Sequence, residues 1–122
     1  MNLLFYSSYG MAIVNVYSLY LCNNPIKIIC LSGLFTSIIN HSIEEGKYGK
    51  QFFRTLDRNV MRAGFTIYHL YQVEYLYLLQ ISCLCYIVSK ITKNIYFHMM
   101  SHFFVAVFHH KMLVTLNQIK LI

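Results

Sequence analysis

Three groups of polar residues interrupt the apolar stretches of this 122-residue sequence and carry side chains that catalysis uses. Ser37 and His41 are four positions apart, as are His98 and His102, so each pair would share one face of a helix. Asp57, the only aspartate, lies between the two pairs. Two histidines at this spacing can ligate one metal ion. A third histidine from another helix would leave the fourth position of a catalytic zinc site open to water.

Each group also has a purely structural interpretation. Asp57 followed by Arg58 is typical of a helix start, where the helix dipole favours an acid. His109 and His110, beside Lys111, are typical of a polar helix end at an interface. A single motif is therefore weak evidence, and the metal-site hypothesis depends on the combination and its order.

The composition indicates which elements must hold these residues. Hydrophobic residues make up 57% of the chain and charged residues 11%, less than half of the ~25% of a typical soluble domain. Lys27 is the only charged residue from Met1 to Ile43, and Glu74 is the only one from Ala63 to Ser89. This pattern argues against a soluble enzyme and against disorder. The net charge of +6 is not arranged as a nucleic-acid surface, so no nucleic-acid partner is expected.

Four apolar stretches predict an all-α fold, a small polytopic transmembrane bundle of about four helices. Residues 1–122 would form a single membrane-embedded helical domain whose partner is the lipid bilayer. Asn23-Asn24-Pro25 predicts a tight turn between the first two helices. The four stretches are Leu3–Cys22, Ile26–His41, Phe65–Ser89 and Ile95–Leu116.

The segment from Ser42 to Arg62 is the polar centre of the sequence and is expected to be a loop, with Gly46 and Gly49 as turn signals. It contains five basic residues, whereas the turn near Lys90 contains two, so the positive-inside rule predicts a cytosolic central loop, 42–62, in an integral multi-pass protein. A single crossing by Phe65–Ser89 would place the final helix start ~30 Å from this loop. The histidines converge only with two short crossings, a re-entrant segment, or a last helix that reaches inward.

The ordered combination resembles the CREST superfamily, which includes alkaline ceramidases and the progestin and adipoQ receptors. The shared features are S-x3-H closing one apolar run, one Asp before the next, and H-x3-H in the last. The family has seven spans, with the Asp on the third and H-x3-H on the seventh. The resemblance implies Zn²⁺ ligation by His41, His98 and His102. It also implies that Ser37 and Asp57 are catalytic residues that hold the water activated by zinc.

The resemblance implies a membrane-embedded, zinc-dependent hydrolase-like protein that acts on ceramide-type lipid amides, in a reduced or inactive form. Two alternatives stay open. The chain could be a small non-enzymatic multi-pass membrane protein with incidental histidines. It could also be a decayed or accidental reading frame, because its richness in Ile, Leu, Tyr, Phe, Asn and Ser is typical of AT-rich DNA.

Overall fold

The computed structural model describes residues 2–120, with side chains described for residues 2–116. This part of the chain is entirely helical between its turns, which confirms the all-α prediction. Five helices are present rather than about four. They are α1 (Leu3–Leu21), α2 (Lys27–Ser42), α3 (Lys50–Leu70), α4 (Leu76–Thr92) and α5 (Ile95–Lys120).

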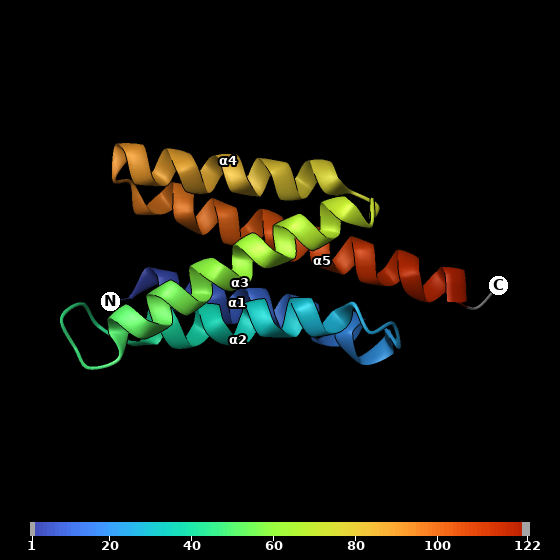
Figure 1. Cartoon of the computed structure of the whole chain (residues 1–122), viewed down its shortest axis with the longest axis horizontal. Helices are drawn as coiled ribbons and strands as arrows, with labels where there is room; N and C mark the ends of the chain where they lie inside the picture. The colour runs from blue at the N-terminus through green and yellow to red at the C-terminus, as the bar shows by residue number, and fades with distance from the viewer. Residues whose placement is uncertain (1, 121–122) are drawn as a thin grey trace.

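Two antiparallel hairpins, α1 with α2 and α4 with α5, are joined by helix α3 (Figure 1). Helix α3 runs diagonally from the first hairpin to the second, packing mainly on α2. Helix α5 lies in the middle and contacts both α1 and α4. The loop between α2 and α3 and the turn between α4 and α5 consequently lie at the same end of the molecule, near the start of α1 (Figure 1).

The central segment Ser42–Arg62 is mostly helix, so its prediction as a loop is wrong. The loop itself is short, and it contains Gly46 and Gly49 at φ angles of 80° and 86°, which glycine adopts without steric cost. Helix α3 then begins at Lys50. Its Arg54, Arg58 and Arg62 follow one another at helical spacing, so the polar residues form one face of a helix.

The apolar stretch Phe65–Ser89 is also divided, by a turn over residues 71–75. Gln72 and Tyr75 in this turn have φ angles of 50° and 67°. Glu74 is exposed there. Two helices, α3 and α4, therefore separate the loop after α2 from the start of α5, and because the second returns along the first the two ends come together.

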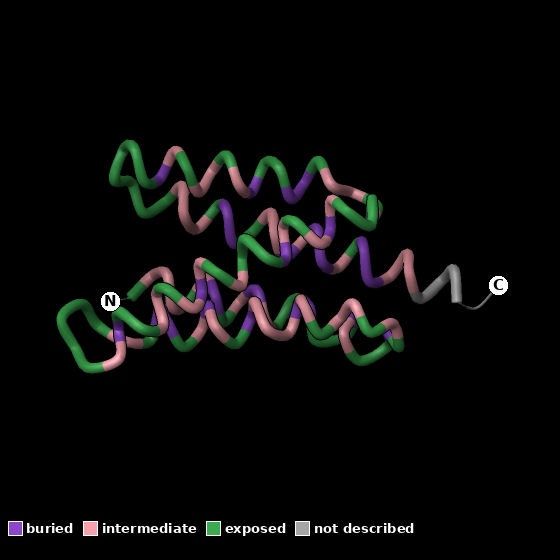
Figure 2. The backbone as a smooth tube through the Cα atoms, in the orientation of Figure 1, coloured by how far each residue is buried: buried purple, intermediate pink, exposed green. Residues whose placement is uncertain are grey.

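Small polar residues hold the helix pairs close to one another. The Ser8 and Ser37 hydroxyls lie 3.0 Å apart and join α1 to α2. The Ser82 hydroxyl donates to the Ser101 carbonyl at 2.8 Å and joins α4 to α5. Figure 2 shows buried residues on the helix sides that face neighbours and exposed residues on the outer sides. The buried apolar core is Met11, Cys22, Cys30, Leu34, Tyr68, Leu78, Leu79, Ala106, Phe108, Met112 and Leu113.

Many large apolar side chains lie on the outer surface, especially on α1, where Ile13, Val16 and Tyr17 are more than half exposed. Within residues 2–120, no helix combines the length and the apolar character that crossing a bilayer requires.

Candidate metal centre

Three of the predicted site residues, His41, His98 and His102, converge at the end of the molecule where α2 finishes and α5 starts. Their ring centroids are 4.8 to 5.1 Å apart. One nitrogen from each imidazole lies within 4.8 Å of the other two, so small ring rotations would bring all three around one ion. This cluster, hereafter the triad, is the set of three histidines that the resemblance implied as metal ligands.

Local structure explains how the triad forms. His41 lies in the last turn of α2, and His98 lies in the first turn of α5. His102 follows His98 by one helical turn and shares its face. The turn before α5 contains Lys93 in the left-handed conformation, with φ 57°, and this turn reverses the chain from α4 into α5.

Ser7 of α1 fixes the orientation of His102. Its hydroxyl donates to the Leu4 carbonyl at 3.0 Å, and it lies 2.7 Å from His102 Nδ1. A hydroxyl has one hydrogen, so with that hydrogen on the Leu4 carbonyl Ser7 accepts from the Nδ1–H tautomer of His102. The lone pair of His102 is then on Nε2, free for a metal. Such an outer contact is what metal-ligating histidines usually have, and sequence reasoning missed it.

Burial keeps the triad neutral. The pKa of His41 is lowered to about 3, first by burial and then by the nearby charges of His98, Lys50 and Lys90. Burial, followed by the charge of Lys90, lowers the pKa of His98 to about 4, and burial holds that of His102 well below its usual range. A metal needs unprotonated imidazole, and these rings provide it.

His41 Nε2 is buried and has no hydrogen-bond partner among the described residues. An unpaired buried nitrogen is costly, and a bound cation would satisfy it. The donor set also fits zinc, which prefers imidazole nitrogen and takes three protein ligands at catalytic sites. The residues present therefore fit the metal that the sequence predicted.

Asp57 lies beside the triad on α3. It is buried, and its carboxylate accepts hydrogen bonds from Thr36 Oγ1 and Asn40 Nδ2, each at 3.3 Å. Burial raises the pKa of Asp57, and the hydrogen bonds from Asn40 and Thr36 oppose that rise. Asp57, His41 and His98 line one cleft of about 110 Å³.

Ser37 is buried one turn before His41, and the hydrogen-bond partner of its hydroxyl is Ser8. The structure therefore brings Asp57, but not the Ser37 hydroxyl, to the cleft beside the triad.

The structure corrects the interpretation of His109 as part of a polar helix end. It is not at an exposed polar end, because its side chain is buried and its Nε2 lies 2.9 Å from the Tyr68 hydroxyl. Its burial lowers its pKa to about 4. The residue is part of the contact between α3 and α5 rather than of the triad.

Comparisons with known proteins give no relative for this chain: no protein-family model matches it, and neither does any curated protein or solved structure.

Proposed function

We propose that this chain is a zinc-dependent hydrolase-like protein of reduced CREST type, acting on lipid amides. The observation that carries the proposal is the convergence of His41, His98 and His102. Asp57 on the third helix and H-x3-H on the last helix follow the order of the seven-span family, with two helices fewer. Removing two helices preserves the direction of the last one, so a shortened chain can keep the site.

The reaction would be amide hydrolysis, in which water adds to the carbonyl carbon and the C–N bond breaks to give a fatty acid and an amine. Zinc held by the triad would supply Lewis acidity, polarising the carbonyl and lowering the pKa of a water toward ~7. Asp57 would accept the proton of that water at a carboxylate oxygen and return it to the leaving amine. The raised pKa of Asp57 supports this role, because it makes the carboxylate a stronger base for the proton of the water.

Ser37 and Ser7 would act as positioning residues. The Ser37–Ser8 contact holds α1 against α2. This placement keeps Ser7, the neighbour of Ser8, beside His102. Ser37 would therefore act on the site through the position of α1, rather than by holding the zinc-activated water itself.

The exposed apolar surface supports a lipid environment for the substrate. Several large apolar side chains of α1 and α4 lie more than half exposed, and exposed apolar surface of this kind is typical of contact with membranes or other proteins. We propose that this surface contacts the bilayer, from which a ceramide-like substrate would reach the cleft. The side chains concerned include Ile13, Val14, Val16, Tyr17, Leu84 and Ile91.

Zinc content tests the proposal. Elemental analysis of the detergent-purified chain should give about one zinc per chain, and the triple variant His41→Ala/His98→Ala/His102→Ala should give none above background. His69→Ala is the matched control, because His69 lies at the far end of α3 and outside the triad. Release of fatty acid from a ceramide is then the activity to measure. Equal zinc in the wild type and the triple variant would refute the metal site.

A further inference from the structure

The cleft beside the triad has an excess of basic side chains. Arg54 forms an ion pair with Glu45, the only one among the side chains of residues 2–116. Asp57 accepts its hydrogen bonds from two neutral side chains. The remaining basic groups of the cleft therefore have no carboxylate in contact. The charged residues that line it are Glu45, Lys50, Arg54, Asp57, Arg58 and Lys90.

Lys50 is the most telling of these basic residues, because only 9% of it is exposed. Its Nζ donates to the backbone carbonyl of Asn40, which is a neutral partner. No carboxylate is in ion-pair contact with Lys50, although the charges of Glu45 and Asp57 act on it from farther away. A buried cation without such a contact is costly, and an anion bound in the cleft would reduce that cost. Lys50 thus points to a negatively charged ligand.

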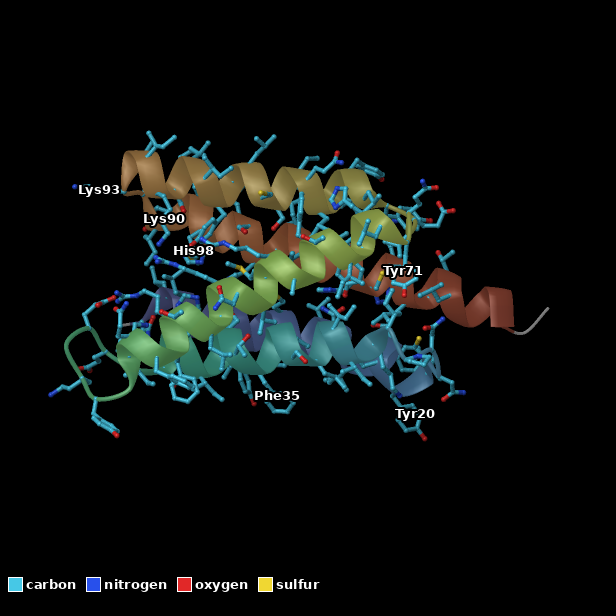
Figure 3. The ribbon with its side chains drawn as sticks, in the orientation of Figure 1. Tyr20, Phe35, Tyr71, Lys90, Lys93 and His98 are labelled. Atoms are coloured by element: carbon cyan, nitrogen blue, oxygen red, sulfur yellow. The ribbon has the colours of Figure 1, made fainter. Side chains whose placement is uncertain are left out.

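Lys90 and Arg58 approach the same cleft from two other positions. Lys90 lies in the last turn of α4, with its Nζ 5.2 Å from the centre of the Tyr86 ring, which also lines the cleft. Figure 3 shows Lys90 at the same end of the molecule as His98, whereas Lys93 points outward. Arg58 follows Asp57 on α3. The basic groups therefore come from two helices, α3 and α4, and line one small space.

We propose that this cleft binds a phosphate group, so that the natural ligand is a phosphorylated lipid amide rather than a neutral one. The inference rests on the proposed function and narrows its substrate class. A cleft of about 110 Å³ accommodates a small polar group but not an acyl chain, which must then lie outside it. Phosphate matches several basic donors at once, since its oxygens accept charge-assisted hydrogen bonds from each. Free phosphate shares this chemistry, so the test separates the two sources.

The test uses the zinc-loaded chain in detergent and compares Lys90→Gln with its matched control, Lys93→Gln. Inorganic phosphate is titrated by calorimetry, and co-flotation measures binding to phosphatidylcholine vesicles with and without phosphatidic acid. Lys90→Gln should weaken phosphate-dependent binding about tenfold, the effect of losing one charge-assisted hydrogen bond. Lys93→Gln should leave it within about twofold, as for an exposed surface charge. Both variants keep Lys50, so the fold is preserved.

The outcomes separate this inference from the proposed function. Binding to phosphatidic acid alone identifies a lipid phosphate, and binding to inorganic phosphate as well identifies free phosphate as a sufficient ligand; both support a phosphate site. Equal losses in the two variants, or no preference for phosphatidic acid and no phosphate binding, would overturn it. Bound zinc without phosphate selectivity refutes only the phosphate site. Phosphate selectivity without bound zinc refutes only the metal proposal.

Discussion

Helix α5 carries two buried histidine sites that differ in what their nitrogen atoms meet. At its start, His98 and His102 face His41, whose Nε2 has no hydrogen-bond partner. Farther along, His109 is alone and its Nε2 lies beside the Tyr68 hydroxyl. Burial lowers the pKa of both His98 and His109 to about 4. A lowered pKa therefore does not distinguish a ligand site from a packed core histidine, whereas the convergence of nitrogens from three imidazoles does.

Single alanine substitutions should give the largest difference between the triad and His109. His41→Ala, His98→Ala and His102→Ala should each reduce zinc from about one ion per chain to background, because two remaining imidazoles give too few ligands for a stable site. His109→Ala should retain zinc while lowering the free energy of unfolding, because it leaves a core cavity. Zinc analysis and chemical denaturation of the same samples measure both effects. Loss of zinc in all four variants, or in none, would contradict the assignment.

The pH dependence of stability should sharpen the comparison through His109. Its pKa is about 4 in the folded chain and ordinarily 6.5, so between these values the unfolded state binds more protons. Stability is unaffected by this group above pH 6.5 and falls as the pH decreases toward 4, by about 3 kcal/mol in total. His109→Phe should remove that share of the slope.

The measurement is the midpoint of denaturation across this pH range for wild type and His109→Phe. The triad imidazoles contribute slope of the same sign, and saturating zinc keeps them unprotonated to lower pH. The difference between the two proteins should therefore persist with zinc present. Parallel curves for wild type and variant would show that His109 is not buried as a neutral imidazole.

The helix faces that carry the histidines could be predicted from the sequence, but the meeting of those faces could not. The i, i+4 pairs gave the shared faces on α2 and α5, and the family resemblance indicated which histidines to combine. Whether those faces meet depended on the turn at residues 71–75, which contains neither Gly nor Pro. Its left-handed residues, Gln72 and Tyr75, are types that rarely mark such turns. The apolar stretch Phe65–Ser89 consequently looked continuous, and the reversal that joins the triad was hidden.

Contacts between distant residues were beyond any local pattern. Ser7 lies 95 positions from His102, and Tyr68 lies 41 from His109. Serine in an apolar helix is compatible with a small packing residue, and His109 beside His110 and Lys111 with an exposed helix end. Only the arrangement of α1, α3 and α5 places the Ser7 hydroxyl beside His102 and the Tyr68 hydroxyl beside His109. The polar face of α3 was hidden for a different reason, because its charged residues resemble those of a solvated loop.

The smallest expected effect compares these two hydroxyl–imidazole contacts directly. Ser7→Ala should weaken zinc binding about tenfold, the lower end for loss of an outer contact, because His102 loses the acceptor that holds its Nδ1–H. Tyr68→Phe is the matched control: it removes the hydroxyl from His109 and should cost about 1–3 kcal/mol of stability without changing zinc affinity. Competition with a fluorescent zinc chelator measures the affinity, and denaturation measures the stability. If Ser7→Ala changes stability alone, as Tyr68→Phe should, the Ser7–His102 contact is only packing, and the two sites differ less than their geometry indicates.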